Sequence, residues 1–347
     1  MYAGRISMDI NWVNLTEQLV NGITVGSFYA LIALGYTMVY GVLKMINFAH
    51  SEVFMIGSYS GLFVLNILTN SGLYEKAPLL VVIITFLAGV LGSSIIGVLL
   101  ERLAYRPLRR AARLAPLISA IGASIFLQEL IRLLPDMGKA ITGISIGGKF
   151  IFSENARTSV VKVLTSFGGA YPKAYPGVLN IGGFMLGDVY IAYGRVIVVI
   201  IAILIMALLF SLVKYTRFGK AMRAVSEDKD SAALMGINVD KVISRTFLIG
   251  SAMAGVAGVL VGLYYIQIKT NMGFTPGIKA FTAAVLGGIG NIPGAMLGAY
   301  ILGLAEVIGV QFLPAVYKDV VAFSLLVLTL IFKPTGILGG KESGRRI

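Results

Sequence analysis

The amino-acid sequence predicts an all-α polytopic membrane protein, a bundle of eight or nine transmembrane helices. Of its 347 residues, 57% are hydrophobic and only 13% are charged, and the mean hydropathy of +0.87 lies outside the range of soluble globular domains. Apolar runs of about 20 residues recur along the chain, and a helix of that length crosses a hydrocarbon core of roughly 30 Å. The runs lack the alternating pattern of strands, so helices, which satisfy their own backbone groups in lipid, are favoured over a barrel.

Nine apolar runs mark the expected spans. They cover about residues 18–42, 52–69, 78–101, 114–133, 193–214, 244–266, 276–290, 294–312 and 318–332. The first is longer than the core of a signal peptide and follows a segment with no cleavage-site pattern, so we expect it to be retained. The seventh is short, opens at Pro276 and contains Gly287, Gly288 and Gly290, which is typical of a broken or re-entrant helix. The count therefore stays at eight or nine.

Basic residues give the expected orientation. Lys and Arg outnumber Asp and Glu by 29 to 16, and the formal charge of +13 would suggest nucleic-acid binding in a soluble protein. Here the excess lies in short loops between spans, which is typical of cytoplasmic loops. Alternation then places the N-terminus outside, residues 135–192 outside as a periplasmic segment, and the tail 333–347 inside if the short run crosses. The residues used are Arg102, Arg106, Arg109, Arg110, Arg113, Lys214, Arg217, Lys220, Arg223, Lys229, Lys241, Arg245, Lys333, Lys341, Arg345 and Arg346.

The segment 135–192 is the one sizeable part that is not plainly a membrane helix. It mixes Gly, Pro and aromatic residues, a composition of turns and short strands or amphipathic pieces. Two interpretations stay open. The segment is a docking surface for an external partner, or it is a linker on the membrane surface with one short helix near 160–167.

Polar residues inside spans are costly in lipid and are therefore candidates for function. Glu306 lies in the middle of a span, and it either makes a structural hydrogen bond or lines the transport pathway. A weakly polar path is also expected along the first span, at Asn21, Thr24, Tyr36, Thr37, Tyr40 and, just beyond it, Asn47. Small residues at helical spacing, among them Gly258 and Gly298, indicate close packing between helices within the chain or across a dimer.

Catalytic chemistry is not expected of this chain. It contains no cysteine and only one histidine, His50, which excludes disulfides, a thiol nucleophile and a multi-histidine metal site. Its glycine-rich stretches do not satisfy the phosphate-binding or dinucleotide-binding patterns. We therefore expect no catalytic residue, no metal site and no cofactor site.

A long polar loop at 215–243 separates the fifth and sixth spans. Its alanines favour helix, and Gly236 followed by Asn238 is a helix stop, so the loop is predicted to hold two short helices along the cytoplasmic face. Such a helix either enters a groove on another protein or rests on lipid headgroups. The sequence pattern alone leaves both possibilities open.

Five blocks of sequence resemble one known family. They lie at 37–59, 117–129, 215–243, 279–306 and 333–339, and in this order they are similar to the permeases of high-affinity branched-chain amino acid ABC importers, specifically the H-type subunit. The resemblance covers nearly the whole chain and is less specific for the cargo. One departure is Ser51, because family members usually have Gly after the histidine of Asn-Phe-Ala-His. Serine disfavours positive φ, so a tight turn there is in doubt.

The resemblance implies one permease domain, residues 1–347, in the bacterial inner membrane. It would pair with a second homologous permease, two cytoplasmic ATPase subunits that bind ATP and Mg²⁺, and a periplasmic substrate-binding protein, and it would import branched-chain amino acids by alternating access. The loop at 217–236 would be the coupling segment to the ATPase. Its candidate residues are Arg217, Gly219, Arg223, Glu227, Asp228, Ala232, Ala233 and Gly236.

Two alternative functions remain. The same machine imports urea, short amides or other amino acids, since related permeases do so on a similar scaffold. Alternatively, the chain is a secondary transporter or channel that works alone. That alternative requires an ion-coupling site within the spans, where acidic residues other than Glu306 are scarce.

Overall fold

The computed structural model describes residues 12–109, 111–112, 114–143, 145–146, 149–150, 153–178 and 182–339. The predictions that involve residues 1–11, Arg110, Arg113 and the tail from residue 340 lie outside the described residues. Within the described part, eight helices are long and apolar enough to cross a membrane, which confirms the all-α polytopic class. They are α1 (Trp12–Leu43), α2 (His50–Asn70), α4 (Pro78–Leu100), α5 (Leu114–Thr142), α7 (Tyr193–Tyr215), α10 (Val239–Tyr265), α12 (Ile292–Phe312) and α13 (Lys318–Phe332), the last extended at its start by the 3₁₀ turn η3 (Ala315–Tyr317).

Shorter elements connect these helices. The helical ones are α3 (Leu73–Lys76), a π-helical turn η1 (Glu101–Tyr105), a 3₁₀ turn η2 (Arg106–Leu108), α6 (Glu154–Phe167), α8 (Arg217–Glu227), α9 (Lys229–Leu234) and α11 (Phe274–Gly287). Among the described residues, the strands form three antiparallel pairs: β1 (Ser145–Ile146) with β2 (Lys149–Phe150), β3 (Lys173–Ala174) with β6 (Gln267–Ile268), and β4 (Gly183–Leu186) with β5 (Val189–Ala192).

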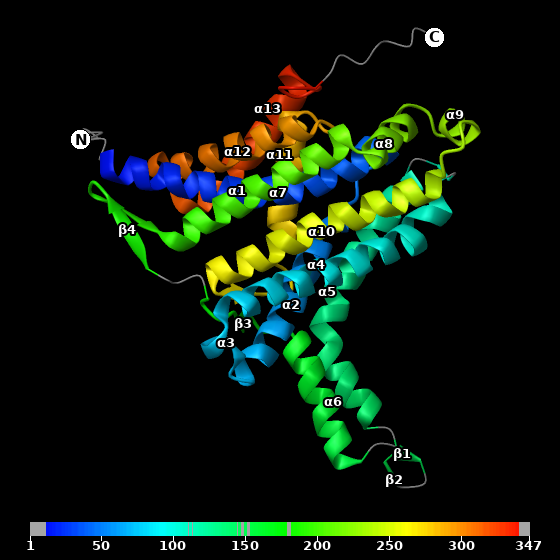
Figure 1. Cartoon of the computed structure of the whole chain (residues 1–347), viewed down its shortest axis with the longest axis vertical. Helices are drawn as coiled ribbons and strands as arrows, with labels where there is room; N and C mark the ends of the chain where they lie inside the picture. The colour runs from blue at the N-terminus through cyan, green and yellow to red at the C-terminus, as the bar shows by residue number, and fades with distance from the viewer. Residues whose placement is uncertain are drawn as a thin grey trace, which may run out of the picture.

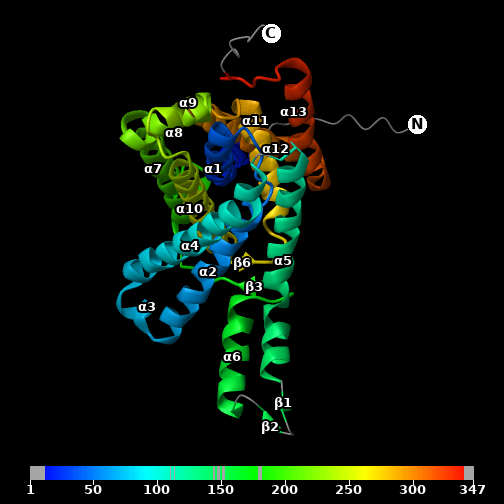
Figure 2. The ribbon, with the colours of Figure 1, turned by 90° about the vertical axis from the view of Figure 1, so that its right-hand side faces the viewer.

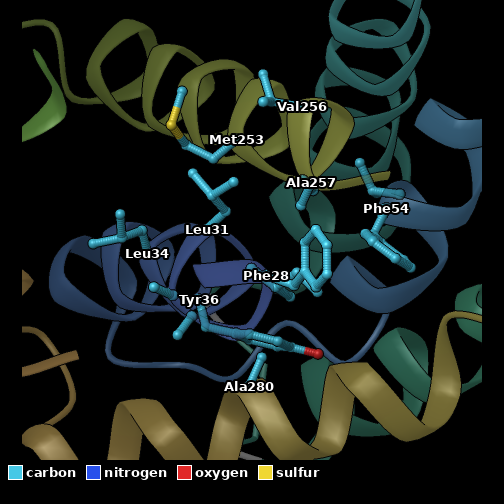
Figure 3. Close-up of a cluster of buried hydrophobic side chains, with 14 of the residues drawn as sticks. Phe28, Leu31, Leu34, Tyr36, Phe54, Met253, Val256, Ala257 and Ala280 are labelled. Atoms are coloured by element: carbon cyan, nitrogen blue, oxygen red, sulfur yellow. The ribbon is translucent and has the colours of Figure 1, made fainter. Parts of the chain in front are cut away.

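The first span, α1, forms the centre of the bundle, and α10 and α12 lie along it (Figure 1). Figure 3 shows how Phe28, Leu31 and Leu34 of α1 lie across from residues of α10, with Phe54 of α2 and Ala280 of α11 at the edges of the cluster. All three α1 residues are almost completely buried. A helix that is apolar all round belongs inside such a bundle.

Glycines let the helices approach closely. A Cβ added to Gly258 of α10 would lie 2.3 Å from the carbonyl oxygen of Phe54 on α2, and one added to Gly298 of α12 would lie 2.2 Å from that of Ala283 on α11. Both glycines belong to the small-residue stripes of the sequence. The stripes therefore pack helices together within this chain, which confirms the first of the two interpretations.

The doubtful seventh run forms one short helix, α11. Residues 266–273 connect α10 to α11 through the two-residue strand β6 and a turn, and α11 then has only 14 residues, about 21 Å of helix. Its first turn lies against α2, since a Cβ on Gly277 would be 2.4 Å from the Cβ of Ser51. The following loop reaches the far end of α1, where Gly290 lies beside Gly41. The segment 266–290 thus runs from the end of α10 to the far end of α1, and whether it crosses the membrane a ninth time stays a prediction.

The fourth span is longer than predicted. It was expected to end near residue 133, but α5 continues through Pro135 to Thr142. Proline lacks an N–H and so leaves the carbonyl oxygen of Ile131, four residues earlier, without its helical donor. The N–H of Gly169 donates to that oxygen at 3.0 Å and so replaces the helical donor that the proline lacks.

The outer half of α5 pairs with α6 as a helical hairpin that projects away from the other helices (Figures 1 and 2). Ser153 caps α6 by accepting from the N–H of Ala156 at 3.4 Å, so the helix predicted near 160–167 begins earlier, at Glu154. Leu164 of α6 packs on Gly138 of α5. Where the structure describes it, the segment 135–192 therefore contains the end of α5, the helix α6 and the strand pairs β1–β2 and β4–β5. Both interpretations of the segment, a docking surface or a linker on the membrane surface, stay predictions. The end of the bundle that holds it is called the α6 end below, and the opposite end, where α8 and α9 lie, the α8 end.

Candidate functional site

The α8 helix folds back onto the end of α7 because of three residues. Thr216 caps it by accepting from the N–H of Gly219 at 3.1 Å. Gly219 lies so close to α7 that an added Cβ would be 2.0 Å from the carbonyl oxygen of Val213. Arg223 donates to that same oxygen through its guanidinium. Gly219 and Arg223, both predicted coupling residues, thus fix the position of α8.

The shorter α9 helix follows after a sharp turn. The carboxylate of Asp228 caps it by accepting from the N–H groups of Asp230 and Ser231 at 2.8 and 3.0 Å. Gly236 has φ +81° and ends the turn after α9, and Asn238 caps α10 at 3.0 Å rather than ending a helix. The predicted pair of short helices between the fifth and sixth spans is therefore present. The sixth span begins at Val239, five residues before the predicted 244.

The surface of this pair is partly apolar. Arg217, Glu227 and Ala233 are exposed as a docking role requires, whereas Ala232 is 4% exposed and packs inside the chain. Leu234 and Met235, which were not among the predicted site residues, are 89% and 83% exposed. The signal that could have found them is their position, because two large apolar residues stand side by side at the end of the short helix, directly before Gly236.

An ionic network joins the base of this loop to the neighbouring spans. Arg109 binds both the buried carboxylate of Glu101 and that of Asp240, the latter at 2.6 Å. Ser244 of α10 donates to Glu101 at 2.6 Å. Burial lowers the pKa of Lys229, and the nearby positive charge of Arg109 lowers it further. The turn after α4 and the start of α10 are thereby held as one unit beside α9.

The predicted pathway residue Glu306 lies at the centre of a second ionic cluster, which we call the Glu306 cluster. Its carboxylate is fully buried and binds Lys279 of α11 at 2.7 Å, Lys318 of α13 at 3.2 Å and the hydroxyl of Tyr29 of α1 at 2.8 Å. Lys279 also binds Asp319 at 2.7 Å. The cluster has two cations and two anions, so it holds four helices together with no net charge.

The other predicted pathway residues do not form one site. Thr24 is buried and donates to its own helix at 2.9 Å, and Asn21 is only half-buried. Asn47 accepts from the hydroxyl of Tyr105 at 2.7 Å, near the π-helical turn. Tyr36 lies edge-on to His50 with ring centroids 4.8 Å apart. Thr37 lines a small, partly open pocket of about 70 Å³ at the α8 end, and Tyr40 is half-buried nearby.

The starts of α2 and α11 meet within the bundle. Ser51 lies in the first turn of α2 without positive φ, so the tight turn that was in doubt does not exist here. Its hydroxyl donates to the carbonyl oxygen of Phe48 at 3.0 Å. The neighbouring carboxylate of Glu52 is completely buried, and one of its oxygens accepts from Ser124 of α5 at 3.4 Å. Helix starts favour such an anion because of their dipoles.

Comparison with known proteins agrees with this architecture. A family model described as the branched-chain amino acid transport system, permease component, matches residues 18–330. The high-affinity branched-chain amino acid transport system permease protein BraD of Pseudomonas aeruginosa is 46% identical over 94% of this chain and 96% of its own length. The permease LivH of Escherichia coli is 44% identical over 96% of this chain and 99% of its own. The probable permease LivM of Methanocaldococcus jannaschii is 27% identical over 66% of this chain and 67% of its own.

Proposed function

This chain belongs to the family of branched-chain amino acid transport permease components, and on that premise we propose that it imports leucine, isoleucine and valine as one half of an ATP-driven importer. It is a multi-pass, non-catalytic membrane subunit. The cargo is proposed because the relatives that match almost end to end bear that description in their names. A machine for urea, short amides or other amino acids is the alternative.

The observation that supports an ATP-driven mechanism is the α8–α9 surface. A membrane protein that worked alone would have no need for a capped pair of short helices with exposed apolar side chains at its tip. Leu234 and Met235 suit a hydrophobic groove on a cytoplasmic ATPase subunit, in the manner of a helix that enters a groove. Since Arg223 and Gly219 fasten α8 to α7, a push on α9 reaches the membrane spans directly.

The complete importer requires partners that this chain does not contain. We propose a second, homologous permease, two ATPase subunits that hold ATP and Mg²⁺, and an external substrate-binding protein. The family includes distinct permeases, as the similarity to both LivH and LivM illustrates, which favours a heterodimer. Two copies of this chain are the alternative.

The α5–α6 hairpin is the proposed docking surface for the binding protein. An open groove of about 740 Å³ runs between the two helices at the far side from α8, and polar residues line it, including Lys139, Glu154 and Lys162. Hydrogen-bonding and charged side chains suit a soluble partner that binds and leaves. Recognition of the cargo would then belong to the binding protein, and the permease would bind it only loosely.

Reconstitution tests the proposal. The chain is placed in liposomes with its candidate partner subunits, binding protein and ATP, and the uptake of labelled leucine and labelled urea is measured. We expect ATP-dependent leucine uptake and none of urea. Urea uptake without leucine uptake would establish the alternative cargo, and leucine uptake by this chain alone without ATP would contradict the importer mechanism.

Two variants of neighbouring alanines test the coupling surface in the same assay. Ala233→Glu adds a charge to an exposed position and is expected to abolish uptake and ATPase association while the permease stays folded. Ala232→Glu adds the same charge to a buried position and is expected to destabilise the permease itself. Normal uptake by the Ala233 variant would exclude this face as the ATPase contact.

A further inference from the structure

A basic pocket opens at the α8 end of the bundle, between the end of α4 and the start of α10. It has a volume of about 430 Å³, and its lining includes Arg102, Arg106, Lys241 and Arg245 together with the single acid Asp240. All four cationic side chains are exposed. The pocket is separate from the α8–α9 tip and from the Glu306 cluster, and the transport mechanism uses none of these four cations.

The charge of the pocket is not balanced from within. Asp240 already binds Arg106 and Arg109, and Glu101 is buried and turned toward Arg109 and Ser244. In the part of the chain that the structure describes, Arg102, Lys241 and Arg245 form no ion pair. The pocket therefore presents an excess of positive charge and several N–H donors to whatever enters it.

Apolar side chains continue from the pocket along the outside of the bundle. Leu248 lies on its wall, and Leu99, Leu103 and Ile95 of the neighbouring α4 face and turn are exposed. The hydroxyl of Ser94 donates to the carbonyl oxygen of Leu248 at 3.4 Å, so α4 and α10 run side by side here. The basic pocket is thus continuous with these exposed apolar side chains of α4, η1 and α10, which we call the strip.

This combination matches one kind of molecule. A soluble phosphate or an acidic segment of a protein would use the cations alone. An anionic phospholipid uses both, because its phosphate binds the arginines and lysine while its acyl chain lies along the leucines. From the charge, the cavity and the strip together, we propose that this pocket binds the headgroup of an anionic phospholipid of the cytoplasmic leaflet.

Binding to the assembled importer in neutral detergent tests the proposal. Dioctanoyl phosphatidylglycerol, dioctanoyl phosphatidylcholine and inorganic phosphate are titrated in parallel, and the dissociation constants are measured. Wild-type protein is expected to bind phosphatidylglycerol at least about tenfold more tightly than either of the others. The triple variant Arg102→Gln, Lys241→Gln and Arg245→Gln is expected to lose that preference.

A matched variant removes the same charge elsewhere. Lys44→Gln, Lys214→Gln and Lys220→Gln neutralise three exposed lysines outside the pocket, and this protein is expected to bind phosphatidylglycerol as wild type does. Thermal unfolding and co-purification of the ATPase subunits are recorded for both variants. Three outcomes would overturn the proposal. They are an equal loss of phosphatidylglycerol binding in both variants, unchanged phosphatidylglycerol binding in the pocket variant whether or not it loses the ATPase subunits, and binding of phosphate to the wild-type protein as tight as that of phosphatidylglycerol. If the pocket variant does not assemble, the single variant Arg245→Gln decides in the same way.

Discussion

Glu306 shows how a single charge is accommodated within the bundle. A carboxylate in a membrane span is stable only when protein groups replace its hydration. Lys279 provides the closest charge at 2.7 Å, and Tyr29 provides a hydrogen bond at 2.8 Å. These partners come from α11 and α1, so their contacts with Glu306 hold both helices against α12. In lipid, the hydrophobic effect does not drive helices together, and polar contacts such as these contribute to their association.

Removing one partner leaves the other charge buried. Lys279→Met is therefore expected to lower the free energy of unfolding in mixed micelles by about 3 kcal/mol, the lower end of the usual range, because Lys318 remains near Glu306. The matched control is Arg132→Met, which breaks the pair with Glu129 on α5. That pair is 46% and 40% exposed, so its loss is expected to cost less than about 1 kcal/mol. Equal effects of the two substitutions would show that Glu306 is hydrated.

The sequence could identify Glu306 but not its partners. A lone acid in an apolar run is visible by inspection, whereas Lys279 lies 27 residues away on a helix too short to be identified as a span. The same limit explains why Arg109, Asp240 and Glu101 were not expected to form a network. Ion pairs between helices depend on which faces meet, and hydropathy does not determine this.

Among the elements, α8 depends on one glycine for its position. An added Cβ at Gly219 would overlap the carbonyl oxygen of Val213 at 2.0 Å, and that atom belongs to backbone that cannot rotate away. Gly236 differs, because its φ is +81° but nothing lies within 4 Å of an added Cβ. Gly219 is therefore required because no side chain fits there, and Gly236 only because its backbone has positive φ.

Substitution by alanine separates these two requirements. Gly219→Ala is expected to displace α8 and to abolish ATP-driven uptake while the spans stay folded. Gly236→Ala is expected to cost about 1 kcal/mol of local stability and to retain most of the uptake. The measurement is uptake in proteoliposomes together with the ATPase rate. Uptake by the Gly219 variant at the wild-type level would show that α8 need not lie against α7 for coupling.

Hydropathy located most of the helices but did not give the ends of those helices that continue beyond their apolar run. All eight long helices match apolar runs, and the doubtful run at 276–290 corresponds to the short helix α11. The runs did not reveal that α5 passes Pro135, since this depends on an N–H from Gly169. They also did not reveal that α10 begins at Val239, since Asp240 and Lys241 are polar although helical.

On the scale of the whole molecule, the two ends of the bundle have different constructions. The α8 end holds the short helices α8 and α9, and the α6 end has a long helical hairpin and the strand pair β4–β5 (Figure 1). Arginines and exposed apolar residues gather at the α8 end. Alternating access requires such a division, because energy enters at one face and cargo arrives at the other. The family resemblance predicted this organisation, whereas the cargo depends on partners outside the chain.

Whether the segment 266–290 crosses the membrane determines on which side of it Lys333 lies. If the segment 266–290 crosses, Asn14 and Lys333 lie on opposite sides of the membrane; if α11 turns back, they lie on the same side. The contacts of Gly290 with the end of α1 favour a crossing. Moreover, the backbone of Ile337 donates to Leu286 at 2.8 Å, which joins the segment after α13 to the same end.

Cysteine labelling can decide this, because the chain contains no cysteine of its own. Single variants Asn14→Cys, Tyr171→Cys, Met235→Cys and Lys333→Cys are exposed to a membrane-impermeant maleimide in right-side-out vesicles. We expect Asn14→Cys and Tyr171→Cys to be labelled at once, and Met235→Cys and Lys333→Cys only after the vesicles are opened. Labelling of Lys333→Cys together with Asn14→Cys in sealed vesicles would mean an even number of crossings. In that case α11 would be part of a re-entrant loop that enters and leaves the membrane on the same side.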